Sequence, residues 1–219
     1  MPLPPAHTLF VQGPAGALET VLEEPQSRVA GHSAFGVICH PHPLGGGALT
    51  NKVVHTLARV FRERGVPTLR FNFRGVGRSG GAFDGGAGER EDALAIVAFG
   101  RERWPGSALW LAGFSFGAWI ALGIAAAVRP ERLVTVAPPV GRWDFAAIPP
   151  PQCPWLIVQG AADELVDAAA VAAWAEQSPA RPRLALLPDT GHFFHGRLAA
   201  LGAVVLSFLD EAAGQQKSS

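Results

Sequence analysis

The chain has 219 residues, of which 48% are hydrophobic and 16% are charged. A chain of this size buries roughly 70 to 75% of its unfolded surface, so we expect a single globular domain over residues 1–219. This composition excludes disordered and fibrous classes. Eighteen basic residues balance eighteen acidic ones, so no excess of positive charge favours a nucleic acid or an acidic membrane as partner.

Cysteine usage and the N-terminal residues bear on the cellular compartment. Cys39 and Cys153 lie far apart in apolar runs, which is typical of reduced core residues. Residues 1–5 carry no basic region and no apolar stretch of a signal peptide. The longest uncharged apolar run, 118–128, is shorter than the roughly 20 residues of a membrane span. We expect a cytoplasmic protein without a membrane segment, either a monomer or a homodimer.

From residue 33 onward, short apolar runs alternate with longer segments of helical period. This alternation predicts βαβ units and a parallel sheet. An antiparallel hairpin at the sheet edge is expected before it, because 7–11 and 17–23 flank a Gly-Pro-Ala-Gly turn. The other expected strands are 34–39, 68–72, 109–112, 133–137, 155–159 and 184–187, and the expected helices are 49–64, 88–102, 115–128, 168–176 and 197–212.

The sequence Gly-Phe-Ser-Phe-Gly at 113–117 follows an apolar strand and opens an Ala-rich helix. This is the context of a nucleophile elbow, in which a sharp turn with nearly side-chain-free flanks projects a serine from the carboxyl edge of the sheet. The helix N-terminus below it favours developing negative charge. The simpler alternative is that Ser115 only caps the helix.

A serine nucleophile needs a base and an orienting carboxylate. Asp163 follows the strand 155–159, and His192 follows the strand 184–187. Both are therefore expected at the same sheet edge as Ser115, in the chain order that the elbow motif predicts. The rival carboxylates are Glu164, Asp167, Asp144 and Asp189.

Four blocks of sequence resemble one family. They are Cys-His-Pro-His-Pro-Leu-Gly-Gly-Gly at 39–47 with Asn-Lys-Val-Val at 51–54, Phe-Asn-Phe-Arg-Gly-Val-Gly-Arg-Ser at 71–79, the elbow, and Asp163 with Gly191-His192. The chain resembles small serine hydrolases of the α/β-hydrolase superfamily, in the dienelactone-hydrolase-like branch. The resemblance implies an α/β fold with a mostly parallel eight-stranded sheet, helices on both faces and a serine triad. Ser115 stands where dienelactone hydrolases proper carry Cys.

An oxyanion hole needs two backbone N–H donors. Phe116, directly after the nucleophile, is expected to supply the first. The second should come from the loop that begins at residue 40, where the prolines have no N–H. Leu44 and His42 remain, and we favour Leu44 because three glycines follow it and let the backbone approach a substrate closely.

The histidines do not have the spacing of a zinc site, because Leu, three Gly and Ala follow the His-Pro-His sequence. We expect neither a metal nor a cofactor, and interpret these histidines as hydrogen-bonding the loop around the oxyanion hole. His195 is interpreted as a surface residue at a helix start. The glycine-rich loop 75–81 lacks the ending of a phosphate-binding P-loop. Arg74 lies directly before this loop and Arg78 lies in it. We expect them either to bind a carboxylate of the substrate or to anchor the loop by an ion pair with Asp84 or Glu89.

Only about sixteen residues separate the strands ending near 137 and beginning near 155, so no lid domain fits there. An open site is expected, with Phe114, Trp143, Arg78 and His42 at its rim. The sequence predicts hydrolysis of small-molecule carboxylic esters with short acyl groups through an acyl-enzyme. The alternatives are a thioesterase, an amidase or an acyltransferase with the same triad, or a non-catalytic binding protein that keeps the fold.

Overall fold

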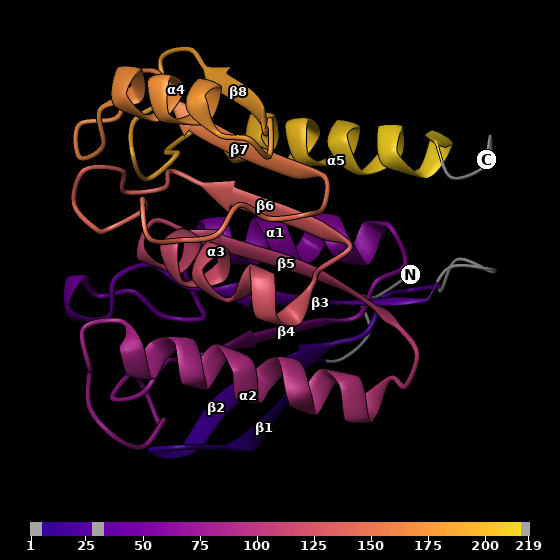
Figure 1. Cartoon of the computed structure of the whole chain (residues 1–219). Coiled ribbons are helices and arrows are strands. Elements are labelled where there is room, and N and C mark those ends of the chain that lie inside the picture. The colour runs from indigo at the N-terminus through magenta and orange to yellow at the C-terminus, as the bar shows by residue number, and fades with distance from the viewer. Residues whose placement is uncertain (1–5, 28–32, 216–219) are drawn as a thin grey trace.

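The computed structural model describes residues 6–27 and 33–215 and contains one eight-stranded sheet (Figure 1). The strand order is β1-β2-β4-β3-β5-β6-β7-β8, with β1 at one edge and β8 at the other. β1 pairs antiparallel with β2, and β2 antiparallel with β4, whereas the remaining pairs are parallel. The strands are β1 (Ala6–Gly13), β2 (Gly16–Glu23), β3 (Ala34–Cys39), β4 (Thr68–Phe71), β5 (Ala108–Phe114), β6 (Arg132–Val136), β7 (Trp155–Gly160) and β8 (Arg183–Leu187).

Helices cover both faces of the sheet, as expected, and divide the core into two layers. Besides the short 3-10 helix η1 (Pro43–Gly45), the described helices are α1 (Lys52–Glu63), α2 (Ala87–Arg103), α3 (Phe116–Val128), α4 (Ala168–Gln177) and α5 (Leu198–Gln215). α1 and α5 pack on one face and α2, α3 and α4 on the other (Figure 1). Alternate residues of β3 follow the two layers, since Phe35 and Val37 face α2 and α3 while Ile38 faces α1.

The fold class expected from the sequence is confirmed, and element ends differ by a few residues. For example, α1 starts at Lys52, whereas the sequence predicts a start at residue 49. The side chain of Asn51 accepts hydrogen bonds from the N–H groups of Val53 and Val54 and so caps the helix there. Residues 1–5, on which the expectation about an export signal rests, lie outside the described residues.

The segment 137–154 stands where a lid would be inserted, and it forms neither a helix nor a strand. A single bridge between Val140 and Trp143 orders its middle. The indole of Trp143 stacks on that of Trp119 in α3, with ring centroids 4.6 Å apart. The segment therefore lies against the helix that follows the elbow and leaves the site open.

Two further observations concern the sequence expectations. Cys39 is buried, Cys153 is partly buried, and neither forms a disulfide. Within residues 6–27 and 33–215, no helix combines the length and the apolar character that crossing a membrane requires.

Candidate active site

The turn from β5 into α3 is a nucleophile elbow. Ser115 has φ 54° and ψ −120°, a backbone conformation that costs a residue with a side chain on the order of 1–3 kcal/mol. The turn is too tight for flanking side chains, because a Cβ on Gly113 would lie 2.0 Å from the carbonyl oxygen of Gly117. On Gly117 it would lie 2.3 Å from that of Cys39. The glycines of the motif are therefore required by close backbone contacts.

Strand register brings the other two groups to this edge. β5 pairs with β3 so that Gly113 lies opposite Cys39, and β7 pairs with β8 so that Gly160 lies opposite Leu187. The turn that carries Asp163 and the loop that carries His192 therefore leave the sheet side by side.

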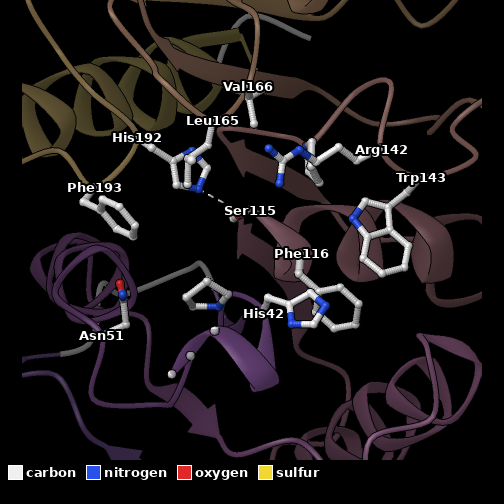
Figure 2. Close-up of a pocket in the computed structure, with 15 residues that line it drawn as sticks. His42, Asn51, Ser115, Phe116, Arg142, Trp143, Leu165, Val166, His192 and Phe193 are labelled. Carbon is white, nitrogen blue, oxygen red and sulfur yellow. Dashed lines mark hydrogen bonds between the residues drawn. The ribbon is translucent and has the colours of Figure 1, made fainter.

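The three side chains form a chain of hydrogen bonds. His192 Nε2 lies 3.1 Å from Ser115 Oγ (Figure 2), and His192 Nδ1 lies 2.9 Å from Asp163 Oδ2. Because a carboxylate only accepts, Nδ1 donates and Nε2 is left to accept from the serine hydroxyl. Ser115 makes no side-chain capping bond to α3, so the alternative of a simple helix cap fails. The contacts expected from the sequence are confirmed.

Asp163 is held from several sides. Its Oδ1 accepts from the N–H groups of Leu165 and Val166, and its Oδ2 accepts from the side-chain amide of Gln159 at 2.9 Å. Burial alone would raise the pKa of Asp163, but the hydrogen bonds from His192, Val166 and Leu165 outweigh it and hold this pKa below its ordinary value. The carboxylate facing His192 is therefore ionised and fixed in orientation.

The rival carboxylates are used elsewhere. Glu164 accepts from the backbone N–H of His192, and that bond lowers the pKa of Glu164. Asp167 caps α4, Asp144 accepts from two backbone N–H groups of its own loop, and Asp189 pairs with Arg197. None of these contacts reaches the imidazole of His192. Glu164 instead holds the backbone of the loop that carries His192.

The loop after β3 contradicts the preference for Leu44 as second oxyanion donor. The N–H of Leu44 donates to His42 Nδ1 at 3.2 Å, capping η1, and Leu44 is 75% exposed. His42 and Phe116 both line the cleft beside Ser115. Their N–H groups make no hydrogen bond to another described residue. The pair available for an oxyanion is therefore Phe116 with His42, the alternative that the sequence left open.

His40 fixes the peptide that carries the His42 N–H. Its ring is fully buried, Nδ1 lies 2.6 Å from the carbonyl oxygen of Pro41, and Nε2 accepts from the N–H of Phe73. The Pro41 carbonyl and the His42 N–H belong to one planar peptide unit, so holding the carbonyl orients the N–H. Burial lowers the pKa of His40 to about 4, although the bond to Pro41 opposes this, so the ring is neutral at neutral pH.

Two further histidines of the described residues also contact protein groups away from Ser115. His55 Nε2 lies 3.0 Å from the guanidinium of Arg70, and His195 is exposed near Phe193. Among the described residues, no group of three or more His, Cys, Asp or Glu side chains has the arrangement of a metal site.

A cleft of about 540 Å³ opens in front of Ser115 (Figure 2). Trp143 and His42 line it, as expected for rim residues. Most of the remaining wall is apolar or glycine. The other lining residues are Pro41, Gly45, Gly46, Gly47, Asn51, Ser115, Phe116, Pro139, Arg142, Leu165, Val166, His192 and Phe193.

Two of the expected rim residues lie elsewhere. Phe114 belongs to β5 and is fully buried, with its ring 5.2 Å from that of His192, because the strand continues through residue 114 and turns this side chain into the core. Arg78 does not line the cleft. It pairs with Glu19 of the edge hairpin at 2.9 Å and lies over the ring of Phe10.

Arg74 is likewise a structural residue and not a substrate contact. Its guanidinium is buried and binds Asp92 at 2.9 Å, with Asp84 farther away at 3.8 Å. Glu89 does not pair with it, since the Glu89 carboxylate accepts from the N–H groups of Asp84 and Gly86. The loop-anchoring interpretation was therefore right in kind, with Asp92 as the main partner.

The sequence interpretation missed Gln159 and Arg142. Gln159 directly follows the apolar run Trp-Leu-Ile-Val of β7 and is fully buried. That polar residue at the end of an apolar strand was a usable signal. Arg142 lies in an irregular loop, where nothing in the local sequence indicates which way a side chain points.

A mostly parallel eight-stranded sheet that carries a strained serine, a histidine and a carboxylate at its carboxyl edge defines the α/β serine hydrolases. Residues 36–152 match the family model described as serine aminopeptidase, S33, and the chain belongs to this family. It is therefore a hydrolase of the α/β serine hydrolase superfamily.

Relatives of this chain include solved structures and one curated protein. An α/β serine hydrolase without a lid from Xanthomonas campestris is 44% identical, with a TM-score of 0.90 over 96% of this chain and 97% of that one. An α/β serine hydrolase homologue from Coxiella burnetii is 43% identical, with a TM-score of 0.88 over 92% and 96%. An uncharacterised protein of Rickettsia prowazekii is 36% identical over 73% of this chain and 68% of its own.

Proposed function

We propose that the protein hydrolyses carboxylic esters of small or short-chain acyl groups through an acyl-enzyme on Ser115. His192 Nε2 takes the hydroxyl proton as Ser115 Oγ attacks the acyl carbon, and Asp163 holds the imidazole in the required tautomer. The N–H groups of Phe116 and His42 bind the negative charge that develops on the carbonyl oxygen. His192 then protonates the leaving alcohol, and water releases the acid by the same route.

The observation that carries this proposal is the hydrogen-bonded chain from Ser115 through His192 to Asp163, with the serine at the floor of an open cleft. Ser115 sits in a strained conformation that a structural serine does not need. Strain of this kind persists where the surroundings enforce it, and it clusters at active sites.

The size class of the substrate follows from the missing lid. The segment 137–154 lies beside the cleft without covering it, and the cleft is bounded by short loops. Long acyl chains need extended apolar walls to remove them from water. The apolar lining of this cleft is confined to a few side chains, among them Phe116, Trp143 and Leu165, which is too little for a long acyl chain.

Labelling with a fluorophosphonate probe tests the nucleophile directly. The wild-type protein is expected to bind the probe covalently, and the Ser115→Ala variant is expected to remain unlabelled. A panel of acetyl and butyryl esters, thioesters and anilides then assigns the reaction class, with esters expected to react fastest. Absence of labelling in the folded wild-type protein would support the binding-protein alternative and overturn the proposal.

A further inference from the structure

One charged side chain enters the cleft without a role in the chemistry so far described. Arg142 belongs to the segment between β6 and β7 and lines the cleft together with Ser115 and His192. Figure 2 shows its guanidinium extended from that segment into the cleft. The arginine that was expected to meet a substrate, Arg78, lies instead on the edge hairpin.

The backbone below Arg142 is ordered. Its N–H donates to the carbonyl oxygen of Pro139 at 3.1 Å, and the bridge between Val140 and Trp143 closes the same turn. Trp143 is in turn stacked on Trp119 of α3. The Cα of Arg142 is therefore held at a fixed place relative to the elbow, while its side chain stays exposed and free to meet a ligand.

Within residues 6–27 and 33–215, no acidic side chain pairs with this charge. None of the residues that line the cleft is Asp or Glu, and the carboxylate of Asp163 is fully buried behind His192. Asp144, two residues along the chain, has its Oδ1 occupied by the N–H groups of Ala146 and Ala147. In the described part of the chain no carboxylate lies within ion-pair distance of Arg142, whereas Arg74 has three and Arg78 has one.

A guanidinium presents parallel N–H groups that match a carboxylate, and such a charge-assisted pair is stronger where water is partly excluded. Trp143, Phe116 and Pro139 line the same cleft as Arg142, and their apolar surfaces partly exclude water from it. We propose that the ester substrates of this protein carry a carboxylate and that Arg142 binds it. This inference rests on the proposed function, since it names the class of ester that the site takes.

Two pairs of esters test the inference, one with the charge on the acyl side and one with the charge on the alcohol side. Monomethyl adipate is compared with methyl hexanoate, and 4-acetoxybenzoate with 4-acetoxybenzamide, by titrating the acid released. In at least one pair, kcat/KM of the wild-type protein is expected to be about tenfold higher for the anion. Arg142→Gln is expected to remove this preference, and Arg142→Lys to keep part of it because the charge remains without the fork.

The matched control is Arg181→Gln, which removes the same charge from an exposed position in the turn between α4 and β8. It is expected to leave the ratio of anionic to neutral kcat/KM unchanged, which excludes an effect of net charge alone. Added salt should shrink the wild-type preference. The inference is overturned if the ratio in Arg142→Gln equals the wild-type ratio for both pairs, or if the wild-type protein prefers the neutral ester of each pair.

Failure of the proposed function gives a different result. If the wild-type protein hydrolyses none of the four esters, ester hydrolysis is wrong, and adipate binding, followed by protein chemical shifts in NMR, decides the subsite separately. Weaker adipate binding to Arg142→Gln than to Arg181→Gln would support the anion site. Equal binding to the two variants would overturn it.

Discussion

Gln159 donates its side-chain amide to the same Asp163 oxygen that receives the His192 ring, with both donor nitrogens 2.9 Å from Oδ2. Gln159 and the Asp163 side chain are fully buried. The carboxylate is therefore clamped by a neighbour four residues earlier in the chain, at the point where β7 ends. Gln159 does not line the cleft, so it acts indirectly, through Asp163 and through longer bonds to the carbonyl oxygens of Gly160 and Val166.

Gln159→Leu is expected to lower kcat about tenfold and to leave KM nearly unchanged. The variant removes one donor that stabilises the ionised carboxylate, so the pKa of Asp163 rises and its orientation loosens. Steady-state kinetics on a short-chain ester measure both parameters. A raised KM with unchanged kcat would mean that Gln159 contacts the substrate, contrary to its burial.

Ser115→Ala is expected to remove at least about 10³-fold of the ester hydrolysis rate without unfolding the protein. Ser115→Gly should be equally inactive but more stable than the alanine variant, by about 1 kcal/mol. Glycine adopts φ 54° without strain, whereas alanine does not. At a position with negative φ the order is reversed, and the glycine variant is the less stable protein. Denaturant titration of both variants checks the order, and an alanine variant more stable than the glycine variant would contradict the strained elbow.

Asp163→Asn is expected to lower the rate by up to about 10⁴-fold, because the amide favours the wrong tautomer of His192. Asp167→Asn is the matched control, since asparagine caps α4 as well as aspartate does. The control should keep wild-type kinetics. Full activity of the Asp163 variant would redirect the search to Glu164, whose carboxylate accepts from the backbone N–H of His192.

Asp163→Asn should also change how the free energy of unfolding depends on pH. The folded-state pKa of Asp163 lies below its ordinary value of 3.8, so the unfolded chain binds a proton more readily. The stability that Asp163 contributes is therefore present above about pH 4 and is lost as the pH falls through the folded-state value. In Asp163→Asn the free energy of unfolding should fall less steeply between neutral pH and about pH 3.

His42→Pro isolates the second oxyanion donor. His42 has φ −53°, which proline adopts, so this substitution removes the N–H at small backbone cost. His42→Ala removes the same ring but keeps the N–H. We expect kcat of the proline variant to lie about 10²-fold or more below that of the alanine variant. Equal kcat values for two folded variants would mean that another N–H binds the oxyanion.

Acyl-chain preference tests the open cleft. Each CH₂ that leaves water contributes about 0.8 kcal/mol, but only where a wall receives it. We expect kcat/KM to peak at acetyl or butyryl esters of one chromogenic alcohol and to fall or stay flat for octanoyl and palmitoyl esters, without activation at a lipid-water interface. A steady rise toward palmitoyl would require a deep acyl tunnel.

The sheet and the contacts among Ser115, His192 and Asp163 were predictable because their signals are local and strong. Branched apolar runs identify the strands, and a parallel arrangement brings the residues that follow each strand to one edge. Ser115, Asp163 and His192 each lie within a few residues of the end of a strand, so few choices remained. The element ends were less predictable, since the start of α1 depends on a capping bond of Asn51.

Loop details could not be predicted because they depend on contacts distant in sequence. Leu44 was favoured from the glycines after it, but its N–H is taken by the ring of His42. Arg78 lies in a glycine-rich loop whose sequence favours the site, but Glu19 of the edge hairpin binds it. Nothing near Arg142 in the sequence indicated that its side chain enters the cleft.

The stacked pair of Trp119 and Trp143 also gives the protein a spectroscopic property. The chain has six Trp and no Tyr, so tryptophan dominates its ultraviolet emission. Trp143 lines the cleft, and its ring lies 4.6 Å from that of Trp119. A molecule seated against this pair changes the surroundings of a built-in fluorophore. Binding of colourless natural compounds is therefore open to direct optical measurement, without a dye and in variants that lack the nucleophile.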